Sequence, residues 1–403
     1  MENRIPKDLT RLLILFSFAM FVQTTSALSI IGALSPIAHE WRITPAAAAL
    51  LVTAFGATFA ISAPLLQMLV GHWVRRTQIL VGLMAMTLGA AAFALAPSYP
   101  LLFSARVAMG LGAALLSPVL LALGSSLVPP RQQGSALALI SMGISIATVI
   151  GVPTASWLAL HLGPRALFGA LALVLAGTAG LVAAFVRDRS RGERVSPRQA
   201  LHLLGTPATL SGLLVVFFIT AGIFATYTMI TPIMHDVYGI SAKMISGALL
   251  LYGLSGLTGN LFVRRASSVW SAETLLRGAM LGLIGIFAVL LTTPLSVAIL
   301  LAALLAWPFV SDVVWPSQQR RMIELEPDFR GIALALSSSF LFSGMAFGSA
   351  LGGMAYAKGG FAAVLAASIL LVSAGLGALT VSIRSRASKT NRFKTLDLAH
   401  GKA

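Results

Sequence analysis

The sequence contains no cysteine and few charged residues. Without cysteine among its 403 residues, the chain has no disulfide, no thiolate metal site and no cysteine nucleophile. Only 10% of the residues are charged, whereas a soluble globular protein carries about 25%. The chain is 57% hydrophobic, with a mean hydropathy of +0.91. This composition indicates a large membrane protein with many spans.

Motifs of enzymes and of ATP-driven pumps are missing as well. The sequence has no H-E-x-x-H, no G-x-S-x-G and no phosphate-binding P-loop. Its six histidines lie at span ends, connections or tails, and none is spaced with acids as metal ligands are. We therefore expect no enzyme, no metal site and no cofactor, and any uphill transport must use an ion gradient.

Twelve apolar runs are long enough to cross a membrane, which requires about 20 mostly apolar residues. They predict an all-α membrane protein with twelve transmembrane helices. A cleaved signal peptide is the alternative for the first run, but that run continues well beyond a signal core. The predicted spans are 12–38, 46–70, 79–96, 101–128, 135–160, 166–186, 207–234, 242–263, 274–292, 297–318, 332–357 and 361–383.

Lysine and arginine predict the orientation, because cytoplasmic connections of membrane proteins carry an excess of both. If the N-terminus is cytoplasmic, nearly all of the 28 basic residues fall on that side, and both termini lie there. The net charge of +16 sits in short clusters between apolar runs, so the expected partner is the lipid bilayer and not nucleic acid. The exceptions are Arg106, which lies within a span, and Arg42, Arg165, Lys243 and Lys358.

One long connection divides the chain into two halves of six predicted spans. Residues 187–206 contain five arginines and Pro197, which is typical of a hydrophilic linker, with room for a short surface helix. The predicted organisation is an N-terminal half at 1–186, this cytoplasmic linker, a C-terminal half at 207–384 and a cytoplasmic tail at 385–403.

The halves are related by a period of about 196 residues. "PIAHE" at 36–40 matches "PIMHD" at 232–236, and "PRQQGSALALIS" at 130–141 matches "PDFRGIALALSS" at 327–338. Parallel repeats of six helices are typical of transporters, which bind their substrate near the membrane midplane between the repeats. A channel rarely needs such a repeat.

Three segments resemble the major facilitator superfamily. They are "RVAMGLGAA" at 106–114, "GISIATVIGVPTASWL" at 143–158 and a degraded loop motif, "PLLQMLVGHWVRR", at 64–76. More narrowly, the chain resembles the twelve-span drug:proton antiporters, near the arabinose-efflux-like permeases. The resemblance implies two pseudo-symmetric six-helix halves, alternating access, a small-molecule substrate, a proton gradient as energy source, a monomer and the cytoplasmic (inner) membrane of a bacterium.

Small residues form a stripe on the fifth and eleventh predicted helices. Spaced by four, they let helix backbones approach closely, and we expect this surface at the hinge between the halves. The loop after the second span keeps two arginines of the superfamily motif, although Gly71 stands at its aspartate. The residues assigned to packing and gating are therefore Arg75, Arg76, Gly143, Gly151, Pro153, Gly344 and Gly348.

One acid lies deep within a predicted span. A carboxylate in hydrocarbon is disfavoured by about 2.5–3.5 kcal/mol, so Asp312 calls for an explanation. The first span has Ala27 and Leu28 where the resembling branch carries an acidic pair, which makes Asp312 the candidate for proton coupling. The alternative is an aspartate satisfied by the backbone near a proline. Arg106 is the candidate counterpart, and the resemblance implies that it transfers protons or holds the fourth helix; the sequence leaves open whether the two meet.

Polar and aromatic residues share the helical face of Asp312. Spacings of three, four and seven place Trp315 and Gln319 on one stripe and Ser311 beside it, which favours a face turned into the bundle. Trp307 and Trp315 are suited to stack on an aromatic or cationic solute. The alternative for all of these residues is packing or hydrogen bonding between helices. The predicted substrate cavity contains Gln23, Thr24, Thr25, Tyr227, Asn260, Trp307, Ser311, Trp315 and Gln319.

These observations favour a secondary transporter with alternating access. The expected reaction is export of a small organic solute (a drug, sugar or metabolite) against proton entry. The alternative is a facilitator or importer of a small metabolite, because the usual coupling acids of the first helix are missing.

The cysteine-free chain allows a direct test of the orientation. Single cysteines at Ser190 and at Ser388 are expected to resist a membrane-impermeant thiol reagent in intact cells, whereas a cysteine at Ser98 is expected to react. Labelling in the opposite pattern would reverse the predicted orientation while leaving the number of spans unchanged.

Overall fold

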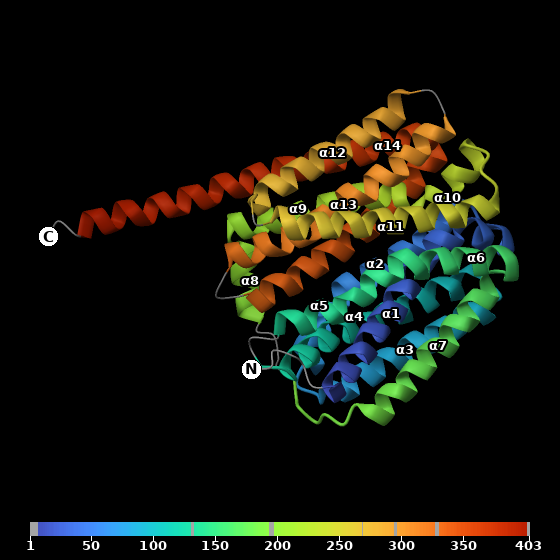
Figure 1. Ribbon diagram of the computed structural model, residues 1–403, viewed down its shortest axis with the longest axis horizontal. Helices are drawn as coiled ribbons and strands as arrows, with labels where there is room; N and C mark the ends of the chain where they lie inside the picture. The colour runs from blue at the N-terminus through green and yellow to red at the C-terminus, as the bar shows by residue number, and fades with distance from the viewer. Residues whose placement is uncertain are drawn as a thin grey trace.

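All regular secondary structure in the described part of the chain is helical. The computed structural model describes residues 7–129, 133–192, 197–267, 269–293, 296–326 and 330–400, and within them strand-like pairing is limited to one bridge between Val74 and Arg191. The helices run side by side in two groups, with the N-terminal half below and the C-terminal half above (Figure 1). The end of the last helix projects away from the bundle.

The N-terminal half supplies six membrane-crossing segments. The fifth of them runs from α5 through a π-helical turn, Ala147–Gly151, into α6. A short helix, α8 (Pro197–Gly205), lies in the linker. The helices of the half are α1 (Lys7–Glu40), α2 (Pro45–Val70), α3 (Arg75–Leu95), α4 (Tyr99–Ser126), α5 (Gln133–Ile146), α6 (Val152–Leu162) and α7 (Pro164–Phe185).

The C-terminal half follows the same plan. Its last helix is interrupted at Gly360, whose φ of 62° and ψ of −152° suit glycine, and this break separates the eleventh and twelfth predicted spans. The helices are α9 (Pro207–Thr228), α10 (Ile230–Pro232) continuing into a π-helical turn, α11 (Ala242–Ala266), α12 (Ala272–Thr292), α13 (Val297–Leu325) and α14 (Arg330–His400).

Eleven helical segments of the described residues are long and apolar enough to cross a membrane, and α14 holds two of the predicted spans. The predicted all-α membrane fold with twelve spans is therefore confirmed. The short connections between spans are explained by local chemistry. Thr44 caps α2 by accepting a hydrogen bond from the amide of Ala47 at 3.1 Å, and Ser271 caps α12 in the same way through the amide of Thr274.

The two halves meet from the middle of the bundle to the end remote from the linker. Thr53 of α2 donates to the carbonyl of Ala346 on α14 at 3.1 Å, and the ring of Phe59 stacks on that of Phe342 at 3.7 Å. Across the second seam, Ser246 of α11 donates to Ser156 of α6 at 3.2 Å. These contacts hold that end closed.

The glycine stripes pack within each half. A Cβ atom at Gly151 would strike the hydroxyl of Thr25 on α1, and one at Gly348 would strike the carbonyl of Ala221 on α9. Gly143 and Gly344 are equally close to backbone carbonyls of α1 and α9. This corrects the expectation of a hinge between the halves. Beside Gly151, the close contact between the halves comes instead from Gly253 of α11, where a Cβ atom would lie 2.6 Å from the carbonyl of Thr148.

The π-helical turn at Gly151 follows from the next proline. Pro153 has no N–H to donate to the carbonyl four residues earlier, and the amide of Val152 bonds back to the carbonyl of Ala147. The turn lies where α1 packs on one side and α11 on the other.

We expect Gly151→Leu to lower the thermal stability of the purified protein, because the added side chain overlaps Thr25. Overpacking of this kind costs about 1–3 kcal/mol. The matched control is Gly177→Leu on α7, where the residue is exposed and a Cβ atom would meet nothing within 4 Å. Equal melting temperatures for the two variants would show that α1 and the fifth span separate easily.

Candidate functional site

Asp312 lies on α13 between two prolines and faces the other helices of the C-terminal half. A Cβ atom at Gly256 would come within 2.6 Å of its Oδ2, so the carboxyl group rests against the backbone of α11. The side chain is half-buried and interacts electrostatically with the phenols of Tyr227 and Tyr252. A side chain at position 256 would force the Asp312 carboxyl group to move.

Four rings from four helices pack beside this acid, and we call them the aromatic cluster: Tyr227 (α9), Tyr252 (α11), Phe287 (α12) and Trp307 (α13). The two tyrosine rings stack at 4.8 Å. The indole meets each of the other rings edge to face, at 6.0 Å from Tyr227, 5.5 Å from Tyr252 and 5.2 Å from Phe287. Edge-to-face packing stabilises such clusters and fixes the ring positions.

Two polar atoms at the cluster have no hydrogen-bond partner among the described residues. The indole nitrogen of Trp307 and the hydroxyl of Ser311, one helical turn further along α13, are both buried. An unsatisfied buried polar group costs about 1–3 kcal/mol, so each one calls for an explanation, such as a bound molecule. Together with the Asp312 carboxyl they form a small polar set inside an aromatic wall.

The remaining predicted residues of α13 are divided between core and surface. Trp315 is half-buried and packs on the hydrophobic core, while Gln319 is exposed. The neighbouring Gln318 is buried and donates to the carbonyl of Gly212 on α9 at 2.8 Å. The C-terminal part of α13 is therefore joined to α9, a helix of the same half.

Two of the predicted cavity residues of α1, Gln23 and Thr25, contact other helices of the N-terminal half. Gln23 exchanges hydrogen bonds with Ser117 of α4 at 2.6 Å and 2.8 Å, which is the interhelical role left open by the sequence. Thr25 is buried against the π-helical turn, and Thr24 is half-buried. The side chain of Asn260 lies outside the described residues.

Arg106 is fully buried in the N-terminal half. Its guanidinium donates to the carbonyls of Leu51, Ser26 and Ala27 at 2.9–3.1 Å and lies 4.7 Å from the ring centre of Phe55. Apart from a contact with Met109 on its own helix, the contacts of Arg106 tie α4 to α1 and α2, which favours holding the fourth helix over pairing with Asp312. One of these carbonyls belongs to Ala27, a position at which the resembling branch carries an acid.

Arg75 and Arg76 fasten the loop after α2. Arg75 donates to Ser126 at the end of α4 at 2.8 Å, and Arg76 donates to the carbonyl of Ala183 on α7 at 2.6 Å. The linker joins the same corner, because the backbone of Arg75 bonds to that of Ser190 at 3.0 Å. In this structure both arginines act within the N-terminal half and its linker.

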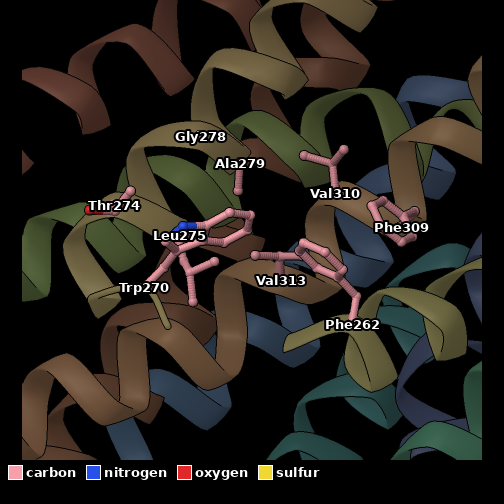
Figure 2. A pocket seen from close by; sticks show the side chains of 9 residues that line it. All are labelled: Phe262, Trp270, Thr274, Leu275, Gly278, Ala279, Phe309, Val310 and Val313. Carbon is pink, nitrogen blue, oxygen red and sulfur yellow. The ribbon is translucent and has the colours of Figure 1, made fainter. Parts of the chain in front are cut away.

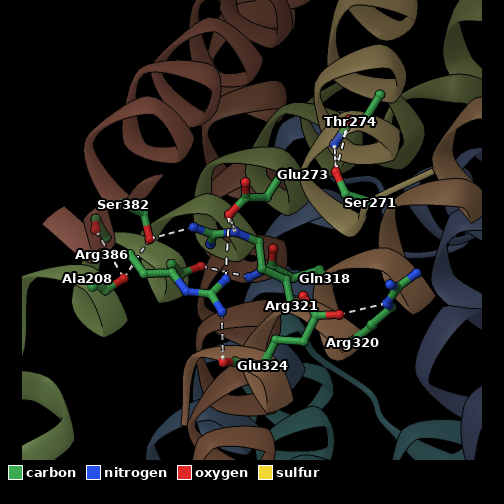
Figure 3. Close-up of polar contacts among 12 residues, drawn as sticks. Ala208, Ser271, Glu273, Thr274, Gln318, Arg320, Arg321, Glu324, Ser382 and Arg386 are labelled. Atoms are coloured by element: carbon green, nitrogen blue, oxygen red, sulfur yellow. Dashed lines mark hydrogen bonds and ion pairs between the residues drawn. The ribbon is translucent and has the colours of Figure 1, made fainter. Parts of the chain in front are cut away.

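An ion-pair cluster around a buried arginine, at the corresponding corner of the C-terminal half, was not predicted from the sequence (Figure 3). Arg321 of α13 is fully buried, lies 3.5 Å from Glu273 of α12 and donates to Ser382 of α14 at 2.7 Å. Glu273 also lies 4.0 Å from Arg386. Both arginines follow apolar runs and count as surface charges in the sequence, whereas the fold places Glu273 between them.

At the closed end, the repeated "PIAHE" and "PIMHD" segments face each other across a cavity of about 370 Å³ between the halves. His39 and Glu40 line it from α1, and His235 lines it from the π-helical turn after α10. Glu40 is paired with Arg165 at 2.7 Å, and His235 with Asp236 at 2.7 Å.

A bundle of two repeated six-helix halves, closed at one end and with an acid among buried rings in one half, defines a membrane transporter. The sequence matches the Major Facilitator Superfamily over residues 14–325, and the chain belongs to this family. It is a multi-pass membrane protein, and the predicted family is confirmed.

Relatives span nearly the whole chain. The uncharacterized MFS-type transporter YbcL of Bacillus subtilis (strain 168) is 31% identical over 342 residues, covering 84% of this chain and 87% of that protein. A chloramphenicol efflux pump of Mycobacterium tuberculosis is 28% identical over 388 residues, covering 94% and 93%. Among solved structures, a bacterial homolog of the human lysosomal transporter Spinster, inward-facing and occupied, has a TM-score of 0.73 at 15% identity, covering 95% of this chain and 98% of that one.

We expect Arg106→Lys to destabilise the protein, because one ammonium group cannot reproduce the planar fork that reaches carbonyls on two helices. Carbonyls left without their donors cost about 1–3 kcal/mol each. Arg165→Lys is the control, since that guanidinium is 43% exposed and its ion pair contributes little. A melting temperature unchanged by Arg106→Lys would contradict the anchoring role.

Proposed function

We propose that the protein exports a small organic solute in exchange for protons, by alternating access. The observation that carries the proposal is Asp312, a carboxyl group at mid-helix between the aromatic cluster and Gly256 of α11. The relatives of the protein support export, since they include chloramphenicol efflux pumps of Mycobacterium tuberculosis. The proton gradient is the proposed energy source, and no cofactor is required.

The proposed location is the inner membrane of a bacterium, with both termini in the cytoplasm. In that orientation, the contacts between Thr53 and Ala346 and between Phe59 and Phe342 close the outer side. In the proposed cycle, a closed outer side belongs to the state that receives solute from the cytoplasm. Both halves of the pathway come from one chain, so a monomer suffices for transport.

The solute is proposed to bind beside the aromatic cluster. The ring of Tyr252, half-buried in α11, offers an aromatic surface, and the unpartnered indole N–H of Trp307 and hydroxyl of Ser311 offer hydrogen bonds. Sites of this kind bind by apolar contact and gain orientation from a few polar groups. A small drug, sugar or metabolite with a planar or apolar face and one acceptor meets these requirements.

Proton coupling is proposed to follow from the changing exposure of Asp312. Burial favours a neutral carboxyl group, whereas contact with water favours the carboxylate. If the group is exposed to the outside in one state and to the cytoplasm in the other, it takes up a proton outside and releases it inside. Neutral Asp312 lies against Gly256 at a lower electrostatic cost, which favours the return of the empty carrier.

The test is Asp312→Asn, which preserves size and hydrogen bonding but cannot titrate. In inside-out vesicles with an acidic interior, we expect at least about tenfold less gradient-driven uptake of chloramphenicol or of another solute found in a chemically diverse screen. Binding and downhill exchange should remain. Asp236→Asn, at an exposed carboxylate, serves as the control and should transport normally.

Two other results have clear meanings. Wild-type pH dependence in Asp312→Asn would assign Asp312 a structural role and move the coupling elsewhere. Solute flux in the wild type without proton movement would favour the facilitator suggested by the missing acids of the first helix.

A further inference from the structure

On the surface of the helix bundle, the C-terminal half carries an open groove of about 300 Å³ (Figure 2). Its floor is α13, with Phe309, Val310 and Val313, and α11 forms one wall with Phe262. The other wall is α12, and Trp270, in the connection between the two walls, lies at one end. The lining is almost entirely apolar.

A comparison of the two repeats indicates how the groove arises in the C-terminal half. Shifting the sequence by 196 residues places Gly82 of α3 on Gly278 of α12, and Gly89 on Gly285. A Cβ atom at Gly82 would lie 2.8 Å from the carbonyl of Gly112 on α4, so these two helices interlock. At Gly278 and Gly285 a Cβ atom would meet nothing within 4 Å.

The sequence of α13 explains the difference. At the same shift, Ala113 and Ala114 of α4 correspond to Phe309 and Val310, whose larger side chains form part of the groove floor. Bulky residues on the floor keep α12 from closing on α13 as α3 closes on α4. An apolar void without a partner loses dispersion contacts, so an occupant is favoured.

The surroundings of the groove indicate a lipid. Gly278 is exposed on the wall, and Phe262 and Trp270 are 37% and 48% exposed, so the mouth opens outward, where a membrane-spanning helix meets acyl chains. Trp270 stands at the end of the groove that adjoins the connection after α11, and tryptophan favours the level of the lipid headgroups. Arg320 holds this connection by donating to the carbonyls of Ser267 and Trp270.

Arg277 offers a positive charge for a lipid headgroup. Arg277 is exposed and directly precedes the lining residue Gly278 in the second turn of α12. No hydrogen bond or ion pair is shown for it within residues 269–293, 296–326 or the other described segments. We propose that the groove binds one acyl chain of an anionic phospholipid from the leaflet on the side of the chain termini, with Arg277 at the phosphate.

The site is distinct from the solute site. Phe309, Val310 and Val313 turn toward the groove, whereas Ser311 and Asp312 lie on other faces of the same helix. A chain seated in the groove supports α13 from the outside and leaves the aromatic cluster untouched. Lipid binding can therefore be measured without any transport assay.

The test uses full-length protein reconstituted in vesicles with increasing fractions of brominated phosphatidylglycerol or brominated phosphatidylcholine. Bromine quenches indole fluorescence on contact, and the signal of Trp270 is the difference between the wild type and Trp270→Phe. We expect half-quenching at a clearly lower fraction of phosphatidylglycerol than of phosphatidylcholine. Gly278→Leu, which fills the groove, should raise that fraction about tenfold.

Two variants complete the test. Gly177→Leu places the same side chain on exposed α7, where a Cβ atom also meets nothing within 4 Å, and should quench as the wild type does. Arg277→Gln should remove the preference for phosphatidylglycerol while retaining quenching. Wild-type quenching of Gly278→Leu, or equal quenching of the wild type by both lipids, would overturn the proposal; absence of quenching by either lipid would show that something other than phospholipid covers Trp270.

Discussion

Inside a membrane, every polar group must find its partner within the protein, and this constraint explains most of the structure. The guanidinium of Arg106 is hydrogen-bonded to three backbone carbonyls of α1 and α2. Thr226 of α9 and Ser368 of α14 form a hydrogen bond with each other at 2.8 Å. Among the described residues several buried polar atoms have no hydrogen-bond partner, and two of them, the indole nitrogen of Trp307 and the hydroxyl of Ser311, lie on the helix of Asp312. These two are the groups proposed to bind the solute.

The two halves share the same helix arrangement but differ in how their helices pack. In the N-terminal half, glycines interlock α3 with α4, and Arg106 joins α4 to α1 and α2. In the C-terminal half, larger side chains on α13 leave a groove on one face, and the acid and the aromatic cluster occupy the others. Because α13 carries both features, the proposed solute site and lipid site act on the same helix from opposite directions.

Part of the candidate site was predictable, and the physical reason is locality. Asp312 and Arg106 stand out because a charge in an apolar run is costly, whatever the fold. Tyr252 and Gly256 carry no such signal, since a tyrosine and a glycine are ordinary residues of a membrane span. The buried position of Arg321 was also missed, because a basic residue at the end of a span looks like a surface charge until Glu273 is placed beside it.

The sequence by itself determined the class of protein, its helical spans and the repeat of its halves. Hydropathy and repetition are properties of the chain, and the bilayer converts long apolar runs into helices without reference to other contacts. Only the tertiary structure decided that the glycine stripes pack within each half, that Arg106 binds backbone and that Asp312 rests on Gly256. These contacts join helices far apart in sequence, and their geometry depends on side-chain volumes that no local pattern records.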